Sequence, residues 1–419
     1  MTNTTVLISG ASVAGPALAF WLERYGYRPT VVERAPEPRP GGYAVDFRGA
    51  SLKVLDRMGL LAQVQARTTG MGEMTYVKES GKPVAVMTSK VLSGELEVLR
   101  GDLVEILYDA TRAKVEYLFD DSIAALTQDG TGVDVTFERG GSRRFDLVIG
   151  ADGLHSNVRR LAFGDESKYL HDLGYYNSVF TVENHLGLDH TARFVNVPGK
   201  TAGTYSAGNN AAKALFYFAS KPLTYDRNDI AAQQRLLSNA FAGVGWEVPR
   251  LLSGIETSPD WYFDAVSQIK MPNYSVGRVA LAGDAGYCAS PLSGMGTSLA
   301  VVGAYVLAGE LLAADGDHLR AFAAYDDRMR GFVEACQKQG KDGAQWFVPG
   351  SKAFLMLRNL TFKFMPYLPW RKLIDELPLK VGNAIDLPDY EAEAKVGVRD
   401  GVGVSGSGDR LRQPGAPRR

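Results

Sequence analysis

The fold is decided by residues 4–33, which read TTVLISGASVAGPALAFWLERYGYRPTVVE. Thr4–Ser9 is short, apolar and rich in β-branched residues, as a buried parallel strand is, and Pro29–Glu33 has the same character. Between them lie a turn of small residues, Gly10–Gly15, and a helical segment, Pro16–Tyr25. A strand, glycine turn, helix and strand within about 30 residues form a βαβ unit. The sequence therefore predicts an α/β protein that begins with a Rossmann-like domain.

The glycine turn has nearly the spacing of a dinucleotide-binding fingerprint. Gly10 and Gly15 occupy the first and last glycines of GxGxxG, and Ser12 stands at the middle one. Such a turn brings a pyrophosphate to the first amides of the next helix, and Glu33 could accept hydrogen bonds from a ribose. A tight turn without a ligand is the alternative. The turn could also be read as the GxSxG elbow of a hydrolase, but an elbow serine follows several strands and Ser12 follows the first.

A second apolar strand leads into an acidic turn. Phe145–Ile149 is followed by Gly150-Ala-Asp152-Gly153 and then by a basic helix start. Asp152 could bind a ligand, although capping the next helix is the commoner role of such a residue.

A third apolar strand, Arg278–Ala282, delivers Asp284 to its carboxyl end. The glycine-rich loop that follows opens a long apolar helix, whose N-terminus would stabilise an electron-rich group. This loop contains Pro291, Gly294, Met295 and Gly296.

Composition excludes several classes of protein. With 46 Lys and Arg against 47 Asp and Glu, the net charge of −1 gives no reason to expect nucleic acid. Two cysteines, Cys288 and Cys336, cannot form a disulfide scaffold, and five scattered histidines predict no metal site. Neither a signal peptide nor an apolar run of about 18 residues is expected, which predicts a cytoplasmic protein without a membrane span.

The change in strand pattern along the chain predicts a discontinuous first domain. Residues 1–174 and 276–340 are expected to form its two parts. A mostly antiparallel β-sheet domain for the substrate, 175–275, is expected as an insertion, because alternating strands replace buried ones there. Residues 341–396 are predicted as a C-terminal helical region, and 397–419, rich in Gly, Ser and Pro, as a disordered tail.

Smaller elements are also predicted. Helices are expected at Ala50–Met58, Ile230–Phe241, Gly296–Ala314 and Ala321–Lys338. Residues 115–138 are expected to form a meander of three successive strands.

Taken in order, the three turns resemble the signatures of the class A flavoprotein monooxygenases, the aromatic hydroxylases with the hydroxybenzoate-hydroxylase fold. The resemblance covers about Thr4 to Lys338. The loop Gly41–Arg48 is similar to that of the tetracycline-inactivating branch, and Arg100 matches an arginine that precedes a helix in the family. Tyr287 stands where the family often has histidine.

The resemblance implies an FAD-dependent monooxygenase that uses NADPH or NADH and O2 to hydroxylate a small aromatic or polycyclic phenolic substrate through a flavin C4a-hydroperoxide. It implies a monomer or homodimer, and it identifies no catalytic side chain and no metal. Part of an aromatic set in the inserted sheet is expected to face the substrate: Phe180, Phe194, Tyr205, Phe216, Tyr217 and Phe218. Contacts with FAD are implied for Gly10, Ser12, Gly15, Glu33, Arg34, Asp46, Arg48, Arg100, Asp152, Asp284, Pro291, Gly294, Met295 and Gly296.

Three alternatives share these motifs. Flavin-dependent halogenases carry a Trp-x-Trp-x-Ile-Pro segment, which neither Trp246 nor Trp261 provides. A flavin reductase of the same fold would not need O2, and a binding protein would hold FAD or a polycyclic ligand without turnover.

Overall fold

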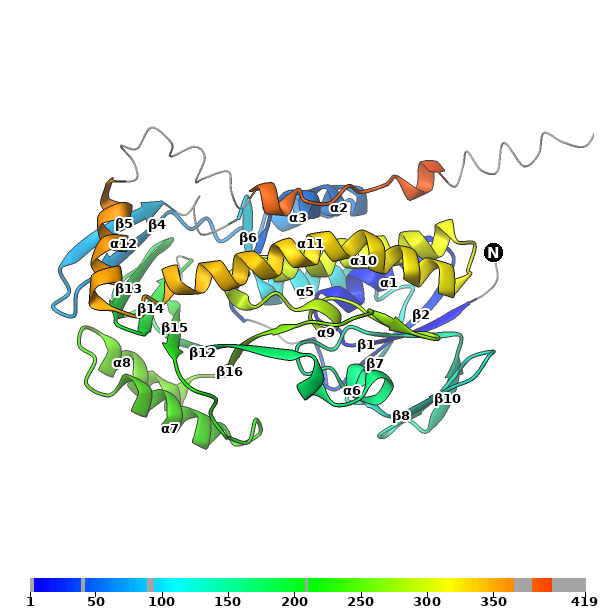
Figure 1. Ribbon diagram of the computed structural model, residues 1–419, viewed down its shortest axis with the longest axis horizontal. Helices are drawn as coiled ribbons and strands as arrows, with labels where there is room; N and C mark the ends of the chain where they lie inside the picture. The colour runs from blue at the N-terminus through cyan, green and yellow to red at the C-terminus, as the bar shows by residue number, and fades with distance from the viewer. Residues whose placement is uncertain (1–3, 39–41, 89–93, 208–209, 365–378, 394–419) are drawn as a thin grey trace, which may run out of the picture.

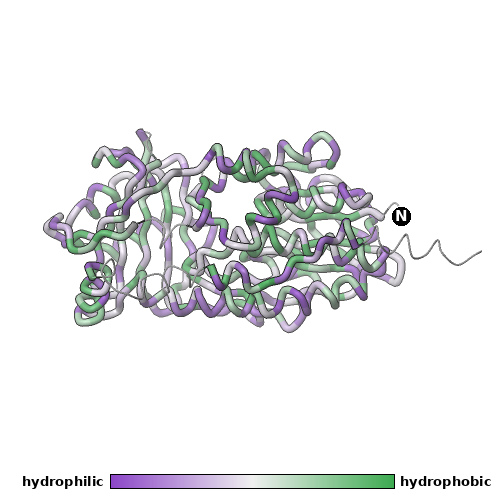
Figure 2. Tube along the Cα trace, turned by 90° about the horizontal axis from the view of Figure 1, so that it is seen from above, coloured by the Kyte–Doolittle hydropathy of each residue, from purple (hydrophilic) through white to green (hydrophobic). Residues whose placement is uncertain are grey.

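Two β-sheets occupy opposite halves of an elongated molecule, and long helices run between them (Figure 1). The computed structural model describes residues 4–38, 42–88, 94–207, 210–364 and 379–393. The predicted tail, 397–419, lies outside these ranges. Hydrophobic segments run through both halves (Figure 2).

The first half is built on a six-stranded sheet with the order β17-β18-β11-β1-β2-β7. All neighbours are parallel except β17 and β18. Val6, Leu7 and Ile8 of β1 are fully buried, as a central strand covered on both faces requires. The strands are β1 (Thr5–Ser9), β2 (Arg28–Glu33), β7 (Glu116–Phe119), β11 (Leu147–Gly150), β17 (Ser275–Val276) and β18 (Val279–Leu281).

Helices cover one face of this sheet and a small antiparallel sheet covers the other (Figure 1). The helices include α1 (Ala14–Arg24), α5 (Arg100–Asp109) and α10 (Gly296–Ala313). Next to them lie α2 (Ala50–Met58), α3 (Leu61–Gln65) and the strand pair β3 (Ala44–Phe47) and β6 (Leu96–Leu99).

The prediction of a meander over residues 115–138 was wrong in part. The first strand, β7, joins the parallel sheet beside β2. The others, β8 (Ile123–Gln128) and β9 (Val133–Phe137), pair instead with β10 (Ser142–Phe145). The chain leaves the parallel sheet after β7 because Val133, Val135 and Phe137 bury one face of the small sheet against the first domain.

The second half is a seven-stranded sheet with the order β16-β12-β15-β14-β13-β4-β5. As predicted, most of its neighbours are antiparallel. The strands are β4 (Glu73–Val77), β5 (Pro83–Thr88), β12 (Leu170–Glu183), β13 (Thr191–Val197), β14 (Lys200–Ser206), β15 (Ala211–Ala219) and β16 (Tyr262–Ile269).

The inserted segment does not form this sheet alone, which corrects the predicted boundaries of 1–174 and 175–275. Strands β4 and β5 come from the first segment, and β4 pairs in parallel with β13. Strand β12 also begins before residue 175, at Leu170. Tyr76 and Met87 of the added hairpin bury themselves against Phe194, so the hairpin is part of the core of this half.

The two faces of the seven-stranded sheet carry different aromatic residues. Phe180, Phe216 and Phe218 point toward α7 (Ile230–Phe241) and α8 (Val248–Ser253) and pack there with Phe241. The opposite face turns Tyr205, Tyr217 and Phe194 toward the first domain and the C-terminal helices. Half of the six predicted aromatic residues therefore point away from the domain junction, as the alternation of a strand requires.

The long helices join the two halves. Helix α11 (His318–Phe347) extends beyond the predicted end at Lys338, and its last residue packs against Tyr217 of the far sheet. Helix α12 (Lys352–Phe364) follows. Short elements complete the described chain: α6 (Asn157–Phe163), α9 (Asp284–Tyr287), and the 3-10 helices η1 (Glu166–Lys168), η2 (Gly254–Thr257) and η3 (Pro291–Ser293).

By length and composition, α10 is apolar enough to cross a membrane, which corrects the expectation that no such run exists. In the fold, 83% of this helix is buried inside the protein. It packs between α1, α2 and α11 as a core helix.

Candidate functional site

The three predicted turns lie side by side at the carboxyl ends of neighbouring strands. Strands β18, β11 and β1 are adjacent and parallel, so the turns that follow them meet at one edge of the sheet. A methyl group added at Gly10 would lie 2.5 Å from the carbonyl oxygen of Ala151, beside Asp152. One added at Gly283 would lie 3.0 Å from Cβ of Ala14. The edge of the sheet thus forms one continuous surface of backbone.

The first turn has no room for side chains at its two glycines. Gly10 has φ of +108°, a conformation that other residues rarely adopt. A methyl group at Gly15 would lie 1.9 Å from the carbonyl oxygen of Gly10. Both glycines are therefore required for the close approach of strand and helix.

Glu33 fixes the end of β2 against this turn. Its carboxylate accepts hydrogen bonds from the Ala11 amide and the Ala35 amide, both at 2.9 Å. The side chain is only half-buried, which leaves it reachable from solvent, and Arg34 beside it is exposed. Contact between Glu33 and a ribose stays a prediction.

Arg100 brings a positive charge to the first turn. It is the first residue of α5, and its Nη1 donates to Ser12 Oγ at 3.3 Å. A methyl group at Gly42 would lie 2.8 Å from Nε of Arg100, so the guanidinium lies between the two loops. Ser12, at the place of the middle glycine, therefore contacts Arg100.

Asp46 and Arg48 lie against the loop that precedes α10. They form an ion pair with 3.3 Å between Arg48 Nη2 and Asp46 Oδ2, and the Arg48 side chain is 6% exposed. A methyl group at Gly294 would lie 3.4 Å from that same Asp46 oxygen and 3.5 Å from that nitrogen. The ion pair is thus placed beside the predicted flavin loop.

The start of α10 has open space where the flavin edge is expected. A methyl group added at Gly296 would meet nothing within 4 Å among the described residues. Asp284 begins α9, and burial raises the pKa of its carboxyl group. Of the other predicted loop residues, Met295 is buried and Pro291 is exposed.

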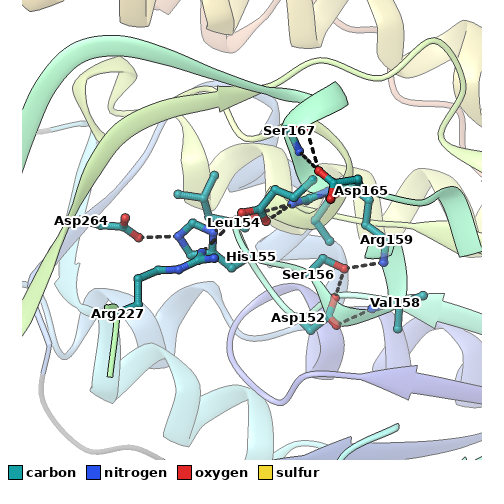
Figure 3. Close-up of polar contacts among 12 residues, drawn as sticks. Asp152, Leu154, His155, Ser156, Val158, Arg159, Asp165, Ser167, Arg227 and Asp264 are labelled. Atoms are coloured by element: carbon teal, nitrogen blue, oxygen red, sulfur yellow. Dashed lines mark hydrogen bonds and ion pairs between the residues drawn. The ribbon is translucent and has the colours of Figure 1, made fainter. Parts of the chain in front are cut away.

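The Asp152 carboxyl group forms hydrogen bonds within the turn that follows it. It accepts hydrogen bonds from Ser156 Oγ at 2.5 Å and from the Val158 amide at 3.0 Å, and Ser156 caps α6 (Figure 3). The structure gives Asp152 the helix-start role that is commoner for such a residue. Its contact with FAD stays a prediction.

An ionic network surrounds the residues after Asp152, and the sequence did not predict it. His155 lies between two carboxylates, 2.9 Å from Glu166 and 2.9 Å from Asp264 (Figure 3). These hydrogen bonds raise the pKa of His155 despite the opposing effect of burial. Since Asp264 belongs to β16 and His155 to the first domain, the network connects the two halves.

Arg159 connects this ionic network to the third turn, the one that contains Asp284. Its side chain is fully buried, donates to Glu166 Oε2 at 2.7 Å and donates to the Ala285 carbonyl at 2.8 Å. Ala285 directly follows Asp284. The second and third predicted motifs are therefore physically linked.

Comparison with known proteins identifies the family. The family described as FAD binding domain matches residues 3–318. A flavin-dependent monooxygenase of Legionella longbeachae is 39% identical over 395 residues, which cover 93% of this chain and 99% of that protein. The chain belongs to the FAD-dependent monooxygenases.

Other relatives extend this result. A protein of Mycobacterium tuberculosis named only as uncharacterized is 51% identical over 340 residues, 80% of this chain and 91% of that protein. The crystal structure of tetracycline destructase Tet(55) has a TM-score of 0.82 and 39% identity, and the match covers 93% of this chain and all of that one. The predicted family and fold class are confirmed.

The residues at the sheet edge fit the FAD of this family. The Gly10–Gly15 turn offers helix amides beside the Arg100 cation, as a pyrophosphate requires. The Glu33 carboxylate contacts the same turn, and Gly283, next to Asp284, lies against Ala14. Hydroxyl groups of the adenosine and ribitol parts could donate to these two acidic side chains. The free space at Gly296 continues this surface to the N-terminus of α10.

In this monooxygenase, tyrosines line the junction between the FAD domain and the sheet. Tyr43 and Tyr262 have ring centres 6.1 Å apart, and the Tyr205 hydroxyl accepts a hydrogen bond from the Ala44 amide at 3.2 Å. Burial raises the pKa of Tyr43, Tyr205, Tyr217 and Tyr262, so all four stay neutral phenols. Tyr205 and Tyr217 belong to the predicted aromatic set, whereas Tyr43 and Tyr262 lie outside it.

Proposed function

We propose that this FAD-dependent monooxygenase uses NAD(P)H and O2 to hydroxylate a polycyclic phenolic substrate. The observation that carries the proposal is the likeness to tetracycline destructases along nearly the whole chain, at 39% identity and a TM-score of 0.82. Reduced FAD activates O2 so that one oxygen atom can be transferred to an electron-rich carbon, and the protein supplies binding and orientation.

Each part of the site has a task in this reaction. The Gly10–Gly15 turn and Arg100 would hold the pyrophosphate, and Asp284 the ribitol. The N-terminus of α10 would stabilise negative charge on the reduced flavin. These roles leave the chain without an assigned catalytic side chain, because the cofactor carries out the oxidation.

The substrate would lie between the loop before α10 and the inner face of the seven-stranded sheet. Leu292 of that loop packs with Tyr217 and Val266 of the sheet, so the two surfaces are neighbours and the proposed substrate site lies beside this contact. Neutral tyrosines on both sides offer hydrogen-bond donors and acceptors to phenolic and keto groups. A flat polycyclic ligand would suit such an aromatic junction.

The first experiment is an anaerobic titration of the purified yellow protein with NADPH, followed by air. We expect the flavin absorbance to bleach and to return when O2 is admitted. Failure to load the protein with FAD would contradict the proposal. So would a bound flavin that stays oxidised in the presence of both NADPH and NADH.

The second experiment tests the substrate class. Tetracycline and simpler phenols are added during steady NADPH oxidation, and the products are analysed by mass. We expect a polycyclic phenol to accelerate NADPH consumption and to gain one oxygen atom. Acceleration without an oxygenated product would mean uncoupled oxidation and would exclude that compound as a substrate.

A further inference from the structure

Two carboxyl groups face each other beside the proposed flavin loop. Asp46 of β3 and Glu97 of β6 are direct partners in the antiparallel pair, so their side chains lie on the same face. This register brings the two carboxyl groups close enough to share a hydrogen bond. Ionised carboxylates only accept hydrogen bonds, so a hydrogen bond between the two groups requires one proton.

Burial raises the pKa of both carboxyl groups, and their different neighbours favour the proton on Glu97. Asp46 has the Arg48 cation at 3.3 Å, which favours its charged form. Glu97 has a neutral partner, the Thr69 hydroxyl, which donates to Oε1 at 2.5 Å. Burial and the neighbouring charge of Asp46 raise the pKa of Glu97 to about 7.

A phenol and a guanidinium also lie next to the pair. Tyr205 of β14 also faces Glu97, but burial keeps its phenol neutral. The Arg48 cation acts on both carboxyl groups and lowers the pKa of each. Two carboxyl groups thus share one positive charge.

The Asp46–Glu97 carboxyl pair lies where its charge would act electrostatically on the flavin. A methyl group at Gly294 would lie 3.4 Å from Asp46 Oδ2. The Arg48 amide donates to Ser298 Oγ at 3.2 Å, which attaches this strand to the first turn of α10. The negative charge of the reduced flavin is proposed to lie next to that turn.

We propose that Glu97 is a positioning residue that shares one proton with Asp46 and so holds the carboxyl pair beside Gly294 at a single negative charge, balanced by Arg48. The inference rests on the proposed FAD site. When Glu97 is ionised, the pair gains a second negative charge and opposes the charge of a reduced flavin. Reduction then draws one extra proton from solvent onto Glu97.

The test is the pH dependence of the flavin midpoint potential in the FAD-loaded protein. In the wild type we expect the potential to fall more steeply with pH above about 7 than below it, because reduction takes up the extra proton there. Glu97→Gln keeps a hydrogen-bond donor but cannot ionise, so its potential should lack the steeper part and exceed that of the wild type at alkaline pH. Equal pH slopes in both proteins would overturn the proposal.

Glu95→Gln is the matched control. Glu95 lies two positions away, is exposed and loses the same charge on substitution. It should leave the steeper slope in place. If Glu95→Gln removes the slope as Glu97→Gln does, the effect is a general one of surface charge, and the proposal fails.

A second measurement does not depend on bound flavin. The infrared carbonyl band of a protonated carboxyl group is recorded for the FAD-free protein on both sides of neutral pH. We expect a band at the acidic side that disappears as Glu97 ionises and that is absent in Glu97→Gln. Presence of the same band in Glu97→Gln would overturn the assignment. Failure of the wild type to bind FAD would instead contradict the proposed function.

Discussion

Gly15 packs against the Gly10 carbonyl so closely that a methyl group at Gly15 would lie 1.9 Å from the oxygen. Other glycines of the chain have free space, and Gly331 in the middle of α11 meets nothing within 4 Å among the described residues. A substitution by alanine therefore has opposite effects at these two positions, although both glycines lie in helices.

We predict that Gly15→Ala lowers the free energy of unfolding by about 1–3 kcal/mol, because strand and helix must separate. It should also weaken FAD binding. Gly331→Ala should raise stability by up to about 1 kcal/mol, the gain in helix propensity. Urea unfolding followed by circular dichroism, with FAD titration in parallel, measures both. Wild-type FAD affinity in Gly15→Ala would contradict the proposed role of the turn.

At the scale of the element, the segment from the second turn to η1 is tied to β16 through His155. Protonated His155 interacts with Glu166 and Asp264, and its pKa is raised above the ordinary value of 6.5. A raised pKa in the folded protein means that the stabilisation is full below the unfolded pKa. It is lost as the pH rises through the folded pKa.

We predict that the wild type loses stability as the pH rises above the ordinary histidine pKa of 6.5 and that His155→Gln removes this part of the loss. His171→Gln, at an exposed position of β12, is the control and should keep the wild-type profile. Thermal unfolding at a series of pH values gives the comparison. Identical profiles for His155→Gln and the wild type would show that the network does not stabilise the fold.

Elements with local signals could be predicted from the sequence. Helix α7 has its predicted bounds because Asp229 caps it and accepts a hydrogen bond from the Ala232 amide at 2.8 Å. Helix α2 also has its predicted bounds, since Gly59 ends it in a left-handed conformation. Strands β4 and β5 were not predicted, because their place depends on β13, far along the chain.

Contacts between distant parts of the chain also limited the prediction of the site. The three turns and Arg100 could be placed because their spacing is local or their pattern is known. Glu97 was missed because its importance comes from the register that sets it opposite Asp46. His155 was missed because its partner Asp264 lies far along the chain, in the other half of the molecule.

At the scale of the whole molecule, both halves contribute to the region where FAD is proposed to bind. The Tyr205 hydroxyl of the sheet contacts the Ala44 amide of the FAD domain, and α11 spans both halves (Figure 1). A cofactor in this region would stabilise both halves together, because it binds the folded arrangement and not the unfolded chain.

We predict that FAD at a hundredfold excess over its dissociation constant raises the free energy of unfolding by about 2.7 kcal/mol. FMN lacks the adenosine part and cannot use the Gly10–Gly15 turn or Glu33, so the same concentration should give little change. Thermal unfolding with each nucleotide measures the difference. Equal stabilisation by FMN would show that the first turn does not bind the cofactor.

The parallel pairing of β4 with β13 also has a consequence for how such enzymes could diversify. A gene segment encoding residues 175–275 resembles a cassette that recombination could exchange between relatives to alter substrate range. Because the hairpin of β4 and β5 is encoded upstream, an exchanged cassette would meet a partner strand from the recipient gene. Successful hybrids should therefore inherit both stretches from the same parent.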